Sequence, residues 1–244
     1  MRPTALLAHV LSVFSASVPH TGRGCVLYID PCGSDYHDER LRITTEACES
    51  EGIPLVGLWS AGYATMQCAR TDTTPEEADE IMAALAPPPG EEQAWASQNL
   101  EGMLPVIDVV GGSDAGLECS ERLLDALVPS RSNGLLDARR DKYNMHEQLR
   151  AAGLSAAKQV VASEWCEAAT FLEQLPKPLA VVLKPRRGQA SLRVGLARSV
   201  EEAAAQFERV LEMPSTLDVT GDTSSVLLQV CAISAICAIS MRSV

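Results

Sequence analysis

The sequence predicts an α/β fold, for two reasons. From residue 24 onward, short apolar runs alternate with amphipathic stretches, which is the pattern of βαβ proteins. The chain has 244 residues, of which 46% are hydrophobic and 21% are charged. This composition supplies a core for one large domain or two small ones, and it excludes global disorder.

The first part of the chain predicts a Rossmann-like domain over residues 23–128. Strands are expected at 24–30, 53–60 and 104–110. Helices are expected at 36–51, 74–86 and 114–127. Gly52 is a normal stop for the first helix, and Thr74-Pro75-Glu76-Glu77 combines an N-cap, a proline at the first helical position and a capping-box glutamate. Alternating strands and helices predict a three-layer arrangement around a parallel sheet.

The second part, residues 129–230, predicts a smaller α+β domain. Strands are expected at 160–162, 179–184 and 226–230. Helices are expected at 137–152, 163–175 and 199–212. Asp137 and Ser163 are the expected N-caps of the first two helices, and a capping box at Ser199 opens the third.

The net charge of −12 argues against a nucleic-acid binder, because such binding is driven by basic residues that neutralise phosphates. Aromatic residues make up only 4% of the chain, so a surface for stacking single-stranded bases is not expected either. A locally basic pocket for a small phosphate ligand remains compatible with this total.

The eight cysteines form no C-x-x-C pair and have no histidine at ligand spacing. Several lie in apolar stretches, where a thiol behaves as a small buried hydrophobe. We expect reduced, structural cysteines and no metal site built from them, and the chain is assigned to the cytoplasm.

The N-terminal residues 1–22 contain no acidic residue and are mostly apolar over 5–18. This stretch is too short and too interrupted by polar residues for a predicted membrane span. A signal peptide, an organelle transit peptide and a poorly ordered extension all stay open, and the segment is left out of the fold prediction.

One glycine-rich turn, Gly111-Gly112-Ser113-Asp114-Ala115-Gly116, joins a predicted strand to a predicted helix. Its backbone N–H groups could face an anion at the helix N-terminus. It matches neither a dinucleotide fingerprint nor a P-loop. A tight βα turn is therefore the favoured interpretation.

Two basic segments have stronger potential chemistry. Arg139, Arg140 and Lys142 cluster at the start of a helix, where cations are locally unfavourable unless an anion is bound. Lys184 ends an apolar strand and is followed by a loop to Gly195 that contains glycines and arginines. A fixed lysine with a mobile glycine loop suits phosphate oxygens, whereas the alternative is a solvated basic surface.

Taken together, these segments resemble the ATP-grasp superfamily. The matching motifs are Asp141-Lys142-Tyr143-Asn144-Met145, then Leu183-Lys184-Pro185 with its glycine loop, then Val226-Leu227-Leu228-Gln229. The segment 109–118 looks like the last βα unit of the family's pre-ATP-grasp domain. The resemblance covers about residues 24–229 and is closest to amino-acid ligases, peptide ligases and biotin-carboxylase-like members.

The resemblance implies roles at single positions. Lys142 and Lys184 match the two lysines that contact ATP phosphates, and the loop that includes Ser191 would close over those phosphates. Val194 matches an apolar residue that packs on the adenine, and Gln229 lies at the hinge that reads the adenine edge. The arginines of the loop depart from the family's usual glycine and serine.

The resemblance stops after Gln229. The family continues with the acidic residues that hold Mg²⁺ and with the catalytic arginine, whereas residues 231–244 contain no acid and repeat Cys-Ala-Ile-Ser. We therefore expect a truncated product, either a short isoform or a shifted reading frame. Its apolar, β-prone tail carries an aggregation hazard.

The implied function is the ATP-binding portion of an ATP-dependent carboxylate–amine ligase that works through an acyl phosphate. As given, the chain is expected to bind ATP weakly or not at all and not to turn it over. The alternatives are a non-catalytic nucleotide-binding or interaction module and, less favoured, an NAD(P)-binding protein. A full-length relative would use small carboxylate and amine substrates, and a homodimer stays open.

Overall fold

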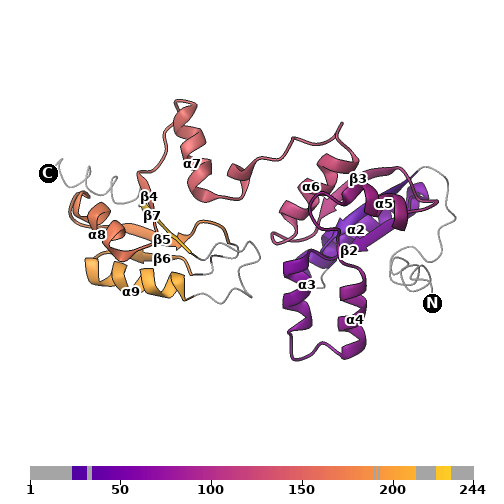
Figure 1. Cartoon of the computed structure of the whole chain (residues 1–244), viewed down its shortest axis with the longest axis horizontal. Helices are drawn as coiled ribbons and strands as arrows, with labels where there is room; N and C mark the ends of the chain where they lie inside the picture. The colour runs from indigo at the N-terminus through magenta and orange to yellow at the C-terminus, as the bar shows by residue number, and fades with distance from the viewer. Residues whose placement is uncertain (1–23, 32–34, 189–190, 192, 213–223, 232–244) are drawn as a thin grey trace. The chain divides into compact units, whose positions relative to one another are not determined.

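The computed structural model describes residues 24–31, 35–188, 191, 193–212 and 224–231. They fall into two compact units divided between Leu135 and Leu136 (Figure 1). The first unit contains a parallel sheet and the second an antiparallel sheet, so the predicted α/β class is confirmed in this coarse form.

Unit 1 is built on a three-stranded parallel sheet in the order β2-β1-β3. The strands are β1 (Cys25–Ile29), β2 (Leu55–Leu58) and β3 (Val106–Gly111). The residues of β1 and β2 are buried throughout, as expected for strands covered on both faces. Tyr28 in the central strand pairs with Gly57 on one side and Val110 on the other.

Helices cover both faces of this sheet. They are α2 (Asp35–Glu51), α3 (Ala61–Cys68), α4 (Pro75–Ala83), α5 (Glu92–Asn99) and α6 (Leu117–Leu127). Leu27 belongs to an apolar cluster with residues of α5 and α6, whereas its neighbour Tyr28 packs with Cys48 of α2. This separation follows from the alternation of side chains along a strand.

The sequence predicted α4 well and missed two helices of unit 1. Thr74 accepts a hydrogen bond from the Glu77 amide, and the Glu77 carboxylate accepts from the Thr74 amide, so the capping box is confirmed. Helices α3 and α5 were not predicted, because each has only eight residues and a weakly segregated apolar face.

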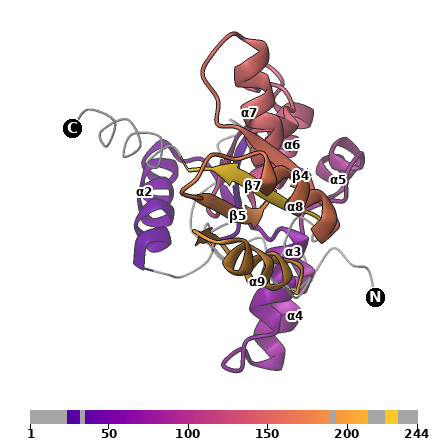
Figure 2. The same ribbon diagram turned by 90° about the vertical axis from the view of Figure 1, so that its left-hand side faces the viewer.

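Unit 2 contains a four-stranded antiparallel sheet in the order β4-β7-β5-β6. Its strands are β4 (Gln159–Ala162), β5 (Val181–Pro185), β6 (Gly195–Ala197) and β7 (Val226–Val230). Helices α8 (Trp165–Glu173) and α9 (Val200–Leu211) pack on one face and form an apolar core with it. Helix α7 (Lys142–Ala151) lies on the opposite side of the sheet from α9 (Figures 1 and 2).

Two predicted helix starts in unit 2 were wrong. Asp137 begins a short 3-10 helix (Asp137–Arg139), and Asp141 caps α7 by accepting from the amides of Tyr143 and Asn144. Helix α8 is capped by Glu164 instead of Ser163, because the Glu167 side chain reaches back to both backbone amides. In the part of the chain that the structure describes, no helix has the length and apolar character of a membrane span.

Candidate functional site

One face of the unit 2 sheet is occupied by helices, and the other presents polar side chains. Along β5, Val181 and Leu183 point into the core with α8 and α9. Lys184 therefore points to the other face, since successive side chains of a strand alternate. Val182 pairs with Gln229 across the ladder and Lys184 pairs with Leu227, so Lys184 and Gln229 are diagonal neighbours on this face.

Lys184 is held by Gln229. Its Nζ donates a 2.7 Å hydrogen bond to Gln229 Oε1, and both side chains are part-buried. Burial lowers the pKa of Lys184 below its ordinary value, because desolvation disfavours the ammonium. The ammonium is thus positioned by a neutral amide instead of a carboxylate, which leaves its positive charge uncompensated by this partner.

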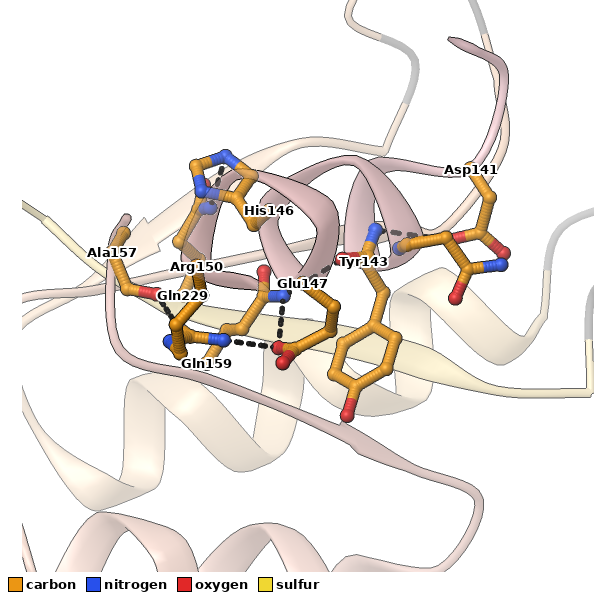
Figure 3. A network of polar contacts seen from close by, with 9 residues as sticks. Asp141, Tyr143, His146, Glu147, Arg150, Ala157, Gln159 and Gln229 are labelled. Carbon is orange, nitrogen blue, oxygen red and sulfur yellow. Dashed lines mark hydrogen bonds and ion pairs between the residues drawn. The ribbon is translucent and has the colours of Figure 1, made fainter. Parts of the chain in front are cut away.

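Gln229 extends the contact to α7. Its Nε2 lies 2.9 Å from Nε2 of His146. In Figure 3 the imidazole lies over the Gln229 side chain, beside a second set of contacts that joins Gln159 to Tyr143 and Glu147. The two glutamines are paired across β4 and β7, so the helix is hydrogen-bonded to neighbouring strands.

Lys142 lies at the start of α7 and contacts the loop that follows β5. Its backbone amide donates to the carbonyl of Arg186 at 3.0 Å. Its Nζ reaches the carbonyl of Gly188 at 3.1 Å and that of Arg186 at 3.5 Å. Lys142 and Lys184 therefore come from different elements and meet the same loop, one at its start and one within it.

Ion pairs join the same two segments. Asp141, whose side chain is 2% exposed, accepts a hydrogen bond of 2.5 Å from Arg186. The Arg186 guanidinium also lies 5.9 Å from the ring centre of Tyr143, a cation–π distance. Arg187 pairs with Asp137 in the preceding 3-10 helix. The arginines that depart from the family pattern thus attach the loop to the N-terminal end of α7.

Ser191 and Val194 lie farther along the loop, where residues 189, 190 and 192 are outside the described part of the chain. Ser191 is exposed and has a φ of 57°, and the Val194 amide donates to its carbonyl at 3.2 Å. Val194 is 44% exposed. Their predicted roles at phosphate and adenine stay predictions.

The glycine-rich turn of unit 1 is closed by the protein itself. The Gly112 amide donates to the carbonyl of Ile29 at 2.7 Å, and the Gly116 amide donates to Ser113 Oγ at 2.9 Å. Ser113 Oγ in turn donates to the buried carboxylate of Asp30 at 2.6 Å. With these amides used internally, the turn is a tight βα connection, which was the favoured interpretation.

The sequence analysis missed two functional features of unit 2. His146 follows Lys142 by one helical turn and so shares a face of α7 with it, which is a signal the motif already contained. The pairing of Asp141 with Arg186 gave no local signal, because the two residues are 45 positions apart.

The described residues do not fit a magnesium site. Mg²⁺ takes carboxylate and other hard oxygen ligands. Among the residues with described positions, no group of three or more His, Cys, Asp or Glu side chains could hold a metal ion. The side chains that contact Lys184 and Gln229 are an amide and an imidazole.

Comparisons with known proteins give structural matches only. No protein-family model matches the chain, and no curated protein does. The chain is similar to a RimK-domain ATP-grasp protein from Sphaerobacter thermophilus, with 17% identity and a TM-score of 0.47 over 85% of this chain and 64% of the other.

Two further solved structures have a comparable level of similarity. One is the biotin carboxylase domain dimer of 2-oxoglutarate carboxylase from Hydrogenobacter thermophilus, in complex with MgADP, ADP and bicarbonate. It has 15% identity and a TM-score of 0.49, over 84% of this chain and 43% of the other. Phosphoribosylglycinamide synthetase from Anaerococcus prevotii has 15% identity and a TM-score of 0.40, over 85% and 45%. The chain thus spans less than two thirds of each of these three proteins, and the solved structures that it resembles are ATP-grasp proteins, as its motifs predicted.

Proposed function

We propose that unit 2 binds the phosphates of ATP on the sheet face that carries Lys184, as the ATP-binding portion of an ATP-dependent carboxylate–amine ligase. In this proposal unit 1 is the Rossmann-like pre-ATP-grasp domain. The single observation that carries the proposal is that Lys184 and Lys142, from a strand and a helix, both contact the segment formed by β5 and its glycine loop.

The electrostatics of this face support an anionic ligand. Lys184 is part-buried and is held by a neutral amide, so a phosphate oxygen would supply the countercharge that Gln229 cannot. Lys142 Nζ is held by two carbonyl oxygens, and a phosphate oxygen is a stronger partner for an ammonium than a neutral carbonyl. Cations placed in this way stabilise transferring phosphoryl groups.

The chemistry proposed for the whole enzyme is activation of a carboxylate as an acyl phosphate, which an amine then attacks. The described residues provide the phosphate-binding cations of such a reaction. They provide no carboxylate set for magnesium, so no step through the metal is assigned to them. This observation favours a second candidate, a nucleotide-binding module without turnover.

Binding of a fluorescent ATP analogue to the whole chain tests the proposal. Lys184→Ala is expected to weaken binding at least about tenfold, because it removes a charge-assisted hydrogen bond to phosphate. Lys177→Ala is the matched control, since Lys177 is exposed in the same unit. Equal affinity of the wild type and Lys184→Ala, or binding of NAD in preference to ATP, would refute the phosphate site.

Release of ADP separates the two candidates. The ligase proposal expects ADP and phosphate when a carboxylate and an amine are supplied together. Binding without release of ADP under any substrate pair supports the module without turnover.

A further inference from the structure

A continuous line of polar contacts connects three elements of unit 2. It runs from Lys184 on β5 through Gln229 on β7 to His146 on α7. The two contacts are 2.7 and 2.9 Å long. Figure 3 shows the α7 end of this line, where His146 approaches Gln229.

The chemistry of the three groups fixes the direction of every hydrogen bond. An ammonium has only donors, so Lys184 requires the Gln229 oxygen as its acceptor. The Gln229 nitrogen, which can only donate, is then directed at Nε2 of His146. His146 must accept at Nε2, and its imidazole is therefore neutral with its proton on Nδ1.

We propose that His146 is a positioning residue: its neutral Nδ1–H tautomer holds the Gln229 amide in the orientation that fixes the Lys184 ammonium, and protonation of His146 breaks this arrangement. The inference rests on the proposed function, in which Lys184 contacts phosphate. It adds a pH-dependent control of that contact.

Protonation of His146 cannot be accommodated by turning the amide. An imidazolium donates from both nitrogens, so the Gln229 nitrogen would face a second donor. If the amide flips, its oxygen meets His146, but its nitrogen then faces the ammonium of Lys184. One amide cannot accept from two cations through opposite ends, so Lys184 loses its partner whenever His146 is charged.

The surroundings of His146 favour the neutral form. Burial lowers the pKa of His146 below its ordinary value, and the positive charges of Lys184 on β5 and Arg150 on α7 lower it further. Glu147 acts in the opposite direction, but its carboxylate already accepts from Arg150 and from Gln159 of β4. Among the described residues, no acceptor lies within hydrogen-bond distance of His146 Nδ1, so none compensates an imidazolium.

The first test requires no nucleotide. Side-chain ¹⁵N NMR of the whole chain at pH 8 is expected to show the Nδ1–H tautomer for His146, assigned by the signal that His146→Gln removes. Gln229→Glu is expected to raise the pKa of His146, because a carboxylate stabilises the imidazolium. An Nε2–H tautomer, or a pKa that Gln229→Glu leaves unchanged, would overturn the arrangement.

The second test measures the affinity for ATP between pH 8 and pH 5.5 in matched variants. Glutamine at position 146 can accept a hydrogen bond near the place of Nε2 and does not titrate, so His146→Gln is the conservative rescue. On acidification the wild type is expected to lose about tenfold more affinity than His146→Gln, which corresponds to one charge-assisted hydrogen bond. ATP's own ionisation cancels in this ratio.

Two further variants complete the second test. His146→Leu removes the acceptor and is expected to bind ATP weakly at every pH. Gln148→Leu, on the exposed side of the same helix, is expected to follow the wild-type profile. Parallel profiles for the wild type and His146→Gln would overturn the positioning role. Absence of ATP binding at every pH, with the expected NMR result, would refute the proposed function and leave the hydrogen-bond arrangement standing.

Discussion

Lys184 and Gln229, which are 45 positions apart in the chain, are joined by a 2.7 Å hydrogen bond between the ammonium and the amide oxygen. They lie on adjacent antiparallel strands, offset diagonally on the same face. The contact gives a part-buried cation its acceptor, and it makes Gln229 a structural as well as a ligand-directed residue.

Gln229→Leu should therefore destabilise the protein. It leaves the ammonium of Lys184 without this acceptor, at an expected loss of about 1–3 kcal/mol in the free energy of unfolding. Urea unfolding measures the loss as a lower midpoint with an unchanged slope. Gln148→Leu, an exposed position, serves as the control, and equal midpoints for the two variants would contradict the prediction.

Asp141→Ala should be among the most destabilising changes in unit 2. It removes the cap of α7 and leaves Arg186 without its buried carboxylate, at an expected loss of about 3–5 kcal/mol. Asp141→Asn should lose less, because an amide oxygen can still accept from Tyr143 and Asn144. Asp137→Asn removes a half-exposed partner of Arg187 and should lose at most about 1 kcal/mol in the same unfolding assay. Similar losses for Asp137→Asn and Asp141→Ala would be inconsistent with this ranking.

Two adjacent glycines should respond differently to alanine. A Cβ on Gly112 would lie 2.6 Å from the Asp30 carbonyl oxygen and 2.7 Å from the Ile29 carbonyl oxygen, which the sheet holds in place. A Cβ on Gly111 would first meet Ser120 Oγ at 3.0 Å, and a hydroxyl can rotate away. We expect a loss of about 3 kcal/mol or more for Gly112→Ala and of about 1 kcal/mol or less for Gly111→Ala, measured as thermal or urea unfolding. The reverse order would show that the turn does not close on Asp30.

Asp30 should give unit 1 a pH dependence of defined sign. Burial raises the pKa of its carboxyl from 3.8, while hydrogen bonds from Ser113 and Ser60 partly oppose the rise. The folded state then binds a proton more tightly than the unfolded state, so stability falls as pH rises from about 3.8 through the folded pKa. Across that range the wild type should lose stability relative to Asp30→Asn, which does not titrate. A relative gain with rising pH would mean that the three donated hydrogen bonds outweigh burial.

The thiols should differ in reactivity according to burial. Burial raises the pKa of Cys25 to about 12 and that of Cys119 to about 11, so neither forms much thiolate near pH 8. Cys166 is exposed on α8. Alkylation followed by peptide mass spectrometry should find Cys166 modified in the native protein, with Cys25 and Cys119 modified only after unfolding. Rapid native modification of Cys25 would contradict its buried position.

Local patterns predicted many elements because their causes are local. The apolar run before Asp30 became the central strand of unit 1, and Thr74, Pro75 and Glu77 formed the expected helix start. The N-cap of α7 was misplaced because Asp137 and Asp141 are equally good capping residues by type. Asp141 holds the cap in the folded chain, where it also pairs with Arg186 from a distant loop.

The sequence alone determined the alternation of strands and helices and the spacing of Lys142, Lys184 and Gln229, since both depend on residue order. The tertiary structure decided which of these side chains meet. The antiparallel register of β5 and β7 brings Gln229 to Lys184, and the packing of α7 brings His146 to Gln229 across 83 positions. Strand register and helix packing are set by the burial of the whole core, which no local window of the sequence contains.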